Sequence, residues 1–530
     1  MKAFRYIFII IVIVLIIFAA YSIYKQNEIV QKEEVTQNEN IQQKEILTNL
    51  RLGISKYDTM NPLISNNKMV QYIDKIIFEP LLSINEDFSL ECSLAKEYSK
   101  TGNTSYIIKL RDDVKWHDTM PFEARDVQFT IEKIKDGTIS SIYFENVKEV
   151  SNVEIIDDHT IKINLEREIP FFEYNLTFPI LPFHYYLNDD FVSTSKIPVG
   201  TGMYKIKNIE STGIELVTND EWWNKEKTPK INNITINLYT SMGELYNAFK
   251  IGNIDLLTTT NENFSQYIGT IGFELREFTA RKYDFLALNM NNNILQRKEV
   301  RQAIACSIDR NNIVASVYNN TYNLSFDPLD FGHYLYMSDV GVIEYNTDIA
   351  NKIMEDNGWV LNYGTWNKLE DYRTIKTSLN LVVNSSNNQR LQVAENIKNQ
   401  LENIGIEINI KAVNDNQYQS YIDNKNYDIL LTGTNISASP DLSLYYEEDN
   451  LSNYSNEEIK KSLNFIKSVN DKKMLKEYYK KIEQVYQEDI PYISLYRNRE
   501  YLIYNSNLMG EIKPTWYNIF YNIENWYRQI

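Results

Sequence analysis

The sequence predicts an α/β fold of two or three domains preceded by an N-terminal transmembrane helix. The chain has 530 residues, more than a single ordinary hydrophobic core accommodates. Strand and helix patterns alternate along the folded part, most clearly between Leu379 and Thr432, as in a largely parallel sheet covered by helices. An uncharged apolar run near the N-terminus is nearly long enough to cross a bilayer.

The apolar run extends from Tyr6 to Ile23 and follows Lys2 and Arg5. At about 1.5 Å per residue, its roughly 18 residues nearly span the hydrocarbon core. A secretory signal peptide has a shorter apolar core and small residues at its cleavage site, which FAAYS lacks, and no Cys follows the run to carry a lipid. We expect residues 1–26 to be an uncleaved anchor with its basic end inside the cell. Cleavage near Ala20 is the alternative.

A polar segment separates the anchor from the folded body. Residues 27–44, NEIVQKEEVTQNENIQQK, contain only isolated apolar side chains, and such a segment cannot bury enough apolar surface to fold. We expect a flexible tether between the membrane and the body. From Glu45 onward the sequence shows no low-complexity segment, no convincing internal repeat and no second apolar span.

The alternation between Leu379 and Thr432 predicts a β-α-β-α-β unit. Its elements are, in order, a strand at Leu379–Val383, a helix at Arg390–Ile404, a strand at Ile406–Ile410, a short helix at Tyr418–Ile422 and a strand at Tyr427–Thr432. Apolar residues three or four positions apart support the first helix. Gly405 follows that helix, where a C-cap requires positive φ.

Three more helices are predicted before this unit. They are Glu299–Ser307, Arg310–Tyr318 and Asn346–Gly358. Asp309 is placed to cap the second of them, and Thr347 or Asp348 to cap the third. The third ends at Asn357-Gly358, a common stop signal for a helix.

The segment Lys109–Ile134 invites comparison with an active site, because His117 lies among several carboxylates. Its pattern favours a structural role instead. Thr104–Arg111 predicts a strand with one apolar face. A buried helical stripe follows at Ala124, Val127, Ile131 and Ile134. Asp126 then lies in the first helical turn, where it complements the helix dipole, and we expect Trp116 and His117 to pack and hydrogen-bond in the connecting loop.

Composition and motifs argue against several functional classes. The net charge of −17 argues against a nucleic-acid partner, which would require a basic surface. None of the four histidines pairs with another at helical spacing, and no Walker, Rossmann or G-x-S-x-G motif occurs. Gly200 and Gly202 lack the rest of a phosphate-binding motif and predict a tight turn. We therefore expect no enzyme activity, metal or cofactor, although a triad of scattered residues stays open.

The two cysteines, Cys92 and Cys306, are far apart in the sequence and belong to no metal-binding pattern. Each lies in an apolar local sequence, so we expect two buried free thiols. A single disulfide between them is the alternative.

A series of sequence blocks lies in a fixed order between Leu50 and about Tyr504. The most specific is LRDDVKWHDTMPFEARDV at Leu110–Val127. The others include MNPL at Met60–Leu63, IFEPLL at Ile77–Leu82, PVGTGMYKI at Pro198–Ile206, NDEWW at Asn219–Trp223, the stretch Leu286–Val314 and IPYISLY at Ile490–Tyr496. Together these blocks resemble the oligopeptide-, dipeptide- and nickel-binding receptors of ABC transporters, the extracellular solute-binding protein family 5.

The resemblance implies a two-lobed, periplasmic-binding-protein-like fold (class II, a Venus flytrap) with an additional α+β subdomain. Two α/β lobes joined by hinge strands would close on a ligand, and the closed form would dock on a permease. The implied divisions are residues 45–78, 199–279 and 490–530 for lobe I, 79–198 for the extra subdomain and 280–489 for lobe II.

The resemblance also suggests where a ligand would bind. The residues concerned are Asn66 and Asn67 from lobe I, Tyr143 from the extra subdomain, Gly433, Thr434 and Asn435 from lobe II, and Tyr496 from the crossing segment. Peptide receptors of this family often carry an Asp that pairs with the α-amino group of the peptide. Ile436 stands at the matching position here, although Asp441 lies nearby, so the sequence does not support recognition of a free amino terminus.

The implied function is that of a membrane-tethered receptor on the extracellular face of a bacterial cell membrane. We expect a monomer that binds oligopeptides and passes them to the permease subunits of an ABC importer. Three alternatives stay open: a peptide-sensing receptor without a transport role, a binder of a metal chelate or other small solute, and an enzyme.

Overall fold

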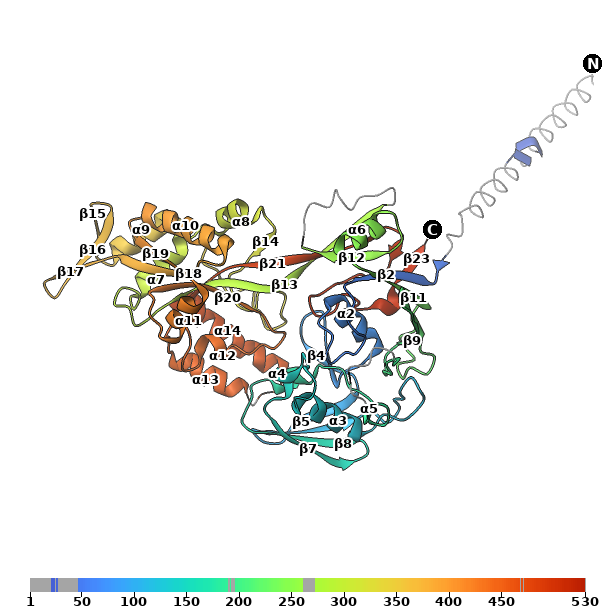
Figure 1. Cartoon of the computed structure of the whole chain (residues 1–530). Coiled ribbons are helices and arrows are strands. Elements are labelled where there is room, and N and C mark those ends of the chain that lie inside the picture. The colour runs from blue at the N-terminus through green and yellow to red at the C-terminus, as the bar shows by residue number, and fades with distance from the viewer. Residues whose placement is uncertain are drawn as a thin grey trace, which may run out of the picture.

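The computed structural model describes residues 21–23, 25–26, 46–188, 191, 196–260, 272–467, 469 and 471–529. Of the expected anchor at 1–26, only residues 21–23 and 25–26 are described, and the tether at 27–44 lies outside the described residues altogether. None of the described helices is long and apolar enough to cross a membrane. The folded body consists of two lobes side by side, with a further subdomain that shares the core of the first lobe and also contacts the second (Figure 1).

The first lobe contains a four-stranded sheet of order β2-β11-β10-β9. Its strands are β2 (Asn49–Ser55), β9 (Tyr204–Ile209), β10 (Gly213–Thr218) and β11 (Asn233–Tyr239). β2 and β11 run parallel, and Leu50, Leu52 and Ile54 of β2 are buried. The other elements are α2 (Lys68–Ile77), α6 (Met242–Lys250) and a small sheet of β1 (Ile46–Leu47), β23 (Tyr527–Gln529) and β22 (Leu508–Met509).

The extra subdomain contains an antiparallel sheet of order β5-β6-β8-β7, with short helices packed against it. Its elements are β3 (Leu82–Ile84), β4 (Leu90–Cys92), β5 (Ala95–Lys100), β6 (Ser105–Leu110), α3 (Ala124–Lys135), α4 (Phe144–Val147), β7 (Val150–Asp157), β8 (Thr160–Leu165) and α5 (Phe183–Tyr186). The strand and the helix predicted in and around residues 109–134 are confirmed as β6 and α3.

A larger sheet of order β12-β21-β13-β20-β18-β19 begins with β12 in lobe I and extends through β21 and β13 into the second lobe (Figure 1). The strands are β12 (Leu256–Thr259), β13 (Phe273–Leu288), β14 (Tyr322–Leu324), β18 (Ser378–Asn384), β19 (Glu407–Val413), β20 (Ile429–Asn435) and β21 (Tyr492–Asn505). The helices are α7 (Lys298–Ser307), α8 (Arg310–Tyr318), α9 (Thr347–Asp356), α10 (Asn388–Asn403), α11 (Asp415–Asp423), α12 (Ser443–Tyr446), α13 (Glu457–Ile466) and α14 (Lys472–Asp489). A small sheet of β15 (Val360–Asn362), β16 (Thr365–Glu370) and β17 (Arg373–Lys376) projects from its outer end (Figure 1).

The predicted β-α-β-α-β unit is confirmed as β18, α10, β19, α11 and β20. β18 pairs in parallel with both β19 and β20. Gly405, which follows α10, has a φ of +88°, as its place after the helix requires. Asp309 caps α8 as predicted, since its side chain accepts a hydrogen bond from the backbone N–H of Asn312 at 3.0 Å.

Two sequence predictions are wrong. Asn346, and neither Thr347 nor Asp348, caps α9, because its extended backbone (φ −160°) lets its side chain accept a hydrogen bond from Ile349 N at 3.0 Å. Cys92 is exposed, because β4 pairs with β3 in a two-stranded sheet that leaves its side chain at the surface. Cys306 is buried as expected, and both thiols are free.

The chain passes between the lobes twice, through β13 and β21 (Figure 1). Near lobe I, residues 273–279 pair with 499–505, and in lobe II residues 283–287 pair with 492–497. The register shifts between Thr279 and Tyr283, so residues 280–282 form a bulge in the ribbon. The sequence-derived divisions at 279/280 and 489/490 therefore fall in or beside these two crossing strands.

Asp126 holds the loop of the 109–134 segment in place. Its side chain is buried, and it accepts hydrogen bonds from Trp116 Nε1 at 3.1 Å, Glu123 N at 2.9 Å and Phe183 N at 2.8 Å. One carboxylate thus joins the loop before α3, the first turn of α3 and the start of α5. The structural interpretation of this segment is confirmed for Trp116 and Asp126.

We predict that Asp126→Ala lowers the free energy of unfolding by about 3 kcal/mol or more, because the buried Trp116 indole N–H and two half-buried backbone N–H groups lose their acceptor. Asp112→Ala is the control, since the exposed Asp112 carboxylate lies 3.8 Å from Lys96 Nζ and contributes little. Urea unfolding followed by tryptophan fluorescence measures both. Equal midpoints for the two variants would contradict the network.

Candidate functional site

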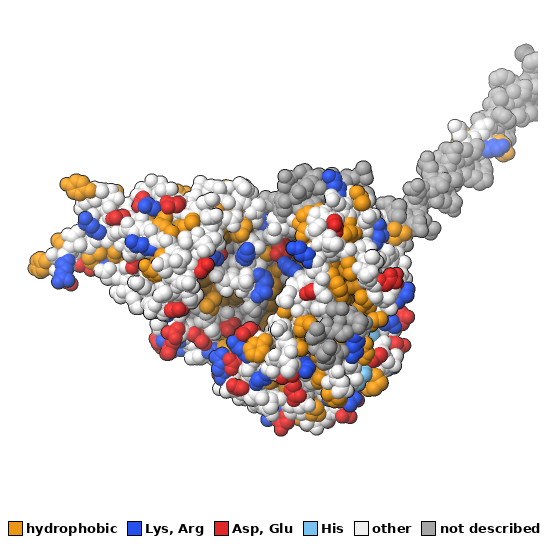
Figure 2. All heavy atoms as spheres, in the orientation of Figure 1, with side chains coloured by type: hydrophobic (Ala, Val, Ile, Leu, Met, Phe, Trp, Pro, Cys, Tyr) orange, Lys and Arg blue, Asp and Glu red, His pale blue; other side chains and the backbone are white. Residues whose placement is uncertain are grey.

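A cavity of about 700 Å³ lies between the two lobes. Figure 2 shows the molecule hollowed there, with basic side chains beside the opening. The walls come from α2, the extra subdomain, the bulge of β13, the loop after β20 and a segment near the C-terminus. The residues that line the cavity include Lys68, Gln71, Tyr72, Lys75, Tyr143, Glu145, Arg281, Ser437, Ser439, Trp516 and Tyr517. Five separate parts of the chain therefore meet at one site.

Helix α2 presents one face to the cavity. Lys68, Gln71, Tyr72 and Lys75 are spaced three or four residues apart, which places them on the same side of the helix. Asn67 begins the helix: its Oδ1 accepts from Met69 N at 3.0 Å, and its Nδ2 donates to Ser55 O at 2.8 Å at the end of β2. The cap thus ties the orientation of α2 to the sheet of lobe I.

The other end of α2 is held by the turn that contains Gly200 and Gly202. Gly202 N donates to Ile77 O at 2.8 Å, and a Cβ on Gly200 would lie only 2.0 Å from the same carbonyl oxygen. Only glycine permits this close approach of two backbones. The tight turn predicted from the sequence is therefore also the support for the last turn of the helix that lines the cavity.

His117 bridges this turn to the extra subdomain. Its Nδ1 accepts from Gly200 N at 3.2 Å, and its Nε2 lies 3.0 Å from Gly202 O. A ring that accepts at Nδ1 and donates at Nε2 must be neutral. Burial lowers the pKa of His117 to about 4, which agrees with that state. The expected hydrogen-bonding role of His117 is confirmed.

The wall from lobe II is the loop after β20, with Ser437 and Ser439. This loop continues the backbone pairing with β13, since Ile436 N donates to Arg281 O at 2.8 Å. The Arg281 side chain adds a second bond, because its Nε donates to Ile436 O at 2.9 Å. Ile436 is a buried apolar residue, so this position supplies no carboxylate to the cavity. Asp441 accepts from Ser443 N and Oγ at 2.9 and 2.6 Å at the start of α12.

Tyrosine hydroxyls supply neutral hydrogen-bonding groups around the cavity. Burial raises the pKa of both Tyr72 and Tyr143 far above the ordinary value, so these phenols stay protonated. Tyr72 OH donates to Trp516 O at 3.3 Å and so joins α2 to the C-terminal segment. A phenol that can donate and accept next to a flat apolar ring suits ligands of varied composition.

Of the residues suggested by the sequence, three line the interlobe cavity or a hollow beside it, and four line neither space. Tyr143 lines the interlobe cavity, whereas Asn66 and Asn67 line an adjoining hollow of about 440 Å³. Lys68 lines both spaces. Gly433, Thr434, Asn435 and Tyr496 line neither of them.

Gly433 and Tyr496 lie instead against a charge pair inside lobe II. Arg390 donates to Asp284 through Nε at 2.9 Å and Nη2 at 2.7 Å, and Tyr496 OH donates to Asp284 Oδ2 at 3.2 Å. A Cβ on Gly433 would lie 2.0 Å from Asp284 Oδ1. These residues therefore hold β13, β20 and β21 together at the lobe II end of the crossing ribbon.

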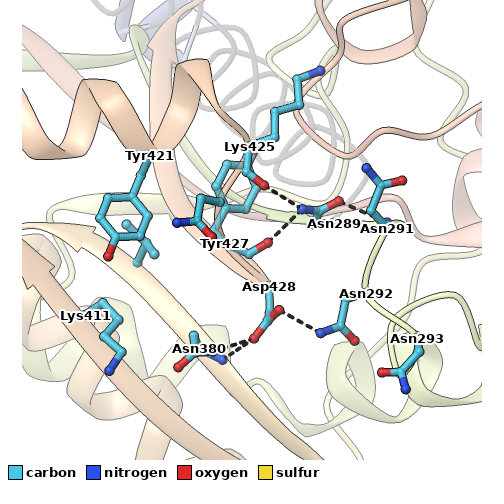
Figure 3. A pocket seen from close by; sticks show the side chains of 12 residues that line it. Asn289, Asn291, Asn292, Asn293, Asn380, Lys411, Tyr421, Lys425, Tyr427 and Asp428 are labelled. Atoms are coloured by element: carbon cyan, nitrogen blue, oxygen red, sulfur yellow. Dashed lines mark hydrogen bonds between the residues drawn. The ribbon is translucent and has the colours of Figure 1, made fainter.

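A second polar hollow, of about 530 Å³, lies wholly within lobe II (Figure 3). Its floor is Asp428, which accepts from Asn292 Nδ2 at 2.7 Å and Asn380 Nδ2 at 2.9 Å. Asn289 Nδ2 donates to Tyr427 O at 2.7 Å. These amides are satisfied by the Asp428 carboxylate and by a backbone carbonyl at the start of β20, and lobe I contributes none of the lining residues. The interlobe cavity, at the opposite end of β20, is the better candidate for a site that responds to lobe closure.

Sequence reasoning missed most of the cavity wall. One local signal was present, the spacing of Lys68, Gln71, Tyr72 and Lys75 on a helix after the MNPL block. No local signal marks Arg281, Trp516 or Tyr517, because their approach to α2 depends on β13 and on the path of the C-terminal segment.

The chain is similar to known proteins both in sequence and in fold. The chain matches the model of bacterial extracellular solute-binding proteins, family 5 (middle part), over residues 90–456. It is 25% identical to the oligopeptide-binding protein AppA of Bacillus subtilis (strain 168) over 498 residues, which cover 88% of this chain and 89% of AppA.

Two solved structures have the same fold. One is NikZ from Campylobacter jejuni in complex with Ni(L-His), with a TM-score of 0.58 at 22% identity, covering 90% of this chain and 99% of NikZ. The other is the periplasmic murein tripeptide-binding protein MppA in its unliganded open form, with a TM-score of 0.77 at 17% identity, covering 92% of this chain and 99% of MppA.

We predict that Gly200→Ala destabilises lobe I by about 2–4 kcal/mol, because the new methyl group overlaps the Ile77 carbonyl and displaces the end of α2. Gly243→Ala in α6 is the matched control, since its Cβ would meet nothing closer than Ser241 Oγ at 3.8 Å. There alanine should stabilise the helix slightly. Thermal unfolding of both variants measures the difference, and similar melting temperatures would refute the close-packed turn.

Proposed function

Because this chain belongs to family 5 of the bacterial extracellular solute-binding proteins, we propose that it captures oligopeptides between its two lobes and delivers them to the permease of an ABC importer. The observation that carries this proposal is the interlobe cavity, whose walls come from both lobes. A ligand that touches both walls binds the closed arrangement more tightly than the open one and shifts the population toward it.

The lining chemistry supports a peptide as the ligand. Gln71, Ser437 and Ser439 offer amide and hydroxyl groups that can bind peptide N–H and C=O groups, and Tyr143 offers a ring face and a hydroxyl. The relative AppA of B. subtilis is named an oligopeptide-binding protein. We include Tyr143, Asn66 and Asn67 among the ligand contacts. Thr434 and Asn435, at the end of β20, would contact the ligand on closure, and Gly433 and Tyr496 would support that strand.

We predict that Tyr143→Ala and Gln71→Ala each weaken ligand binding about tenfold or more, because both remove groups that wall the interlobe cavity. Asn291→Ala, in the hollow of Figure 3, should leave the affinity unchanged. Native mass spectrometry of the full-length protein identifies what co-purifies, and calorimetry with the recovered compounds measures the three variants. A single non-peptide compound would overturn the peptide ligand, and a selective effect of Asn291→Ala would overturn the site.

Ligand saturation should also compact the molecule. Closure about the bulge at residues 280–282 brings the lobes together, so the radius of gyration from small-angle scattering should fall when the recovered ligand is added. An unchanged radius at saturation would contradict closure.

We further propose that residues 1–26 hold the protein at the membrane and that the body lies outside the cell. The uncharged run after Lys2 and Arg5 supports this. N-terminal sequencing of the mature protein should begin at Met1 or Lys2. A start at about residue 21 would indicate a cleaved signal peptide.

A further inference from the structure

The bulge in the crossing ribbon directs a cation into the interlobe cavity. Thr279 pairs with Arg499 and Tyr283 with Arg497, so three residues of β13 face only Asn498 of β21. The middle one of the three is Arg281, which lines the cavity. A bulge commonly redirects a side chain that a regular strand would place elsewhere.

Arg281 has no carboxylate partner in the described part of the chain. Its Nε donates to Ile436 O at 2.9 Å, and its guanidinium carbon lies 5.1 Å from the centre of the Trp516 ring. Among the described residues, neither of its two Nη groups makes a hydrogen bond. Arg281 is exposed at the cavity, and the partial burial of its guanidinium lowers the pKa of that group. A solvent-accessible cation with free N–H donors is a ready partner for an anion.

Lys75 is a second cation of the same kind. Its Nζ lies 3.6 Å from the centre of the Tyr517 ring, and among the described residues no carboxylate lies within ion-pair distance of it. Each unpaired cation is thus held over an aromatic ring of the same C-terminal segment. The rings fix the positions of the two cations without neutralising their charge.

The other charges in the cavity wall cancel. Lys68 Nζ lies 2.6 Å from Glu500, and Glu145 lies 2.6 Å from Lys148 Nζ. The cavity wall carries four charged side chains in all, so Lys75 and Arg281 leave it with an excess of two positive charges. This excess occurs in a protein whose net charge is −17. The net charge of the cavity wall is therefore positive, whereas the net charge of the whole protein is negative.

We propose that Arg281 and Lys75 bind a carboxylate of the ligand, so that the receptor selects anionic peptides. This deepens the proposed function and rests on it. The carboxylate comes from an acidic side chain, because the carboxyl terminus is common to all free peptides and cannot distinguish anionic from cationic ones. Lys75 belongs to lobe I, and Arg281 is bonded to the loop of lobe II through Ile436. An anion between them offsets the repulsion of two like charges, and so it favours closure.

The test uses the full-length protein and a casein digest separated at pH 7 into an anionic and a cationic peptide fraction. The wild type should bind the anionic fraction about tenfold more tightly than the cationic one. Arg281→Gln and Lys75→Gln should each remove most of that preference, and Arg281→Lys should restore part of it because it keeps the charge. Arg276→Gln is the control: Arg276 lies on the same strand outside the cavity, exposed and 3.7 Å from Glu274.

Three results would overturn the proposal. If the wild type binds both fractions equally, the receptor recognises peptides but Arg281 and Lys75 do not select anions. If Arg276→Gln has the same effect as Arg281→Gln, the preference reflects overall charge and not the cavity. If neither fraction binds, the proposed peptide function is wrong, and the proposed preference for anionic peptides is wrong as well. Melting temperatures of the variants exclude a loss of binding through unfolding.

Discussion

The two-stranded ribbon of β13 and β21 is the constraint on which the rest of the architecture depends. In the part of the chain that the structure describes, the backbone passes between the lobes only along this ribbon, and buried charges fix both of its ends. In lobe II, Arg497 is 1% exposed and donates to Asp330 Oδ1 at 2.8 Å and to Pro328 O at 2.7 Å. In lobe I, the fully buried Asp255 accepts from Arg51 N at 2.7 Å and Asn505 Nδ2 at 3.2 Å. Breaking a buried pair costs about 3–5 kcal/mol, so both ends of the ribbon are firmly held, and the bulge at residues 280–282 lies between them.

Helix α2 contributes more residues to the cavity wall than any other helix, and it is likewise held at both ends. Its first turn is tied to β2 by Asn67, and its last turn rests on the glycine turn that His117 holds. The 109–134 segment, with its apparent catalytic cluster, thus affects ligand binding only through the position of a helix. A neutral His117 suits this role, because a protonated ring could not accept the hydrogen bond from Gly200 N.

Local elements of the fold were predictable from the sequence, and the composition of the cavity was not. The unit from β18 to β20 follows from apolar spacing and from Gly405, both of which act within about 20 residues. The motif context of Gly433 and Tyr496 predicts that both residues lie at the ligand. In the structure, both residues lie against the ion pair of Asp284 and Arg390, two residues that are distant from each other in the sequence. Arg281 reaches the cavity only because β13 and β21 fall out of register there, and no pattern in β13 alone reveals that shift.

The ion pair between Lys68 and Glu500 bears on the length of ligand that the receptor accepts. Lys68 separates the interlobe cavity of about 700 Å³ from the hollow of about 440 Å³ that contains Asn66 and Asn67. Its side chain is 51% exposed, and such a pair contributes about 1 kcal/mol or less. A ligand that gains one good hydrogen bond on each side offsets the loss of this pair. The wall between the two spaces is therefore weak, and it allows a long extended ligand to occupy both. The charge at Arg281 and Lys75 then fixes one point of the ligand and leaves its total length open.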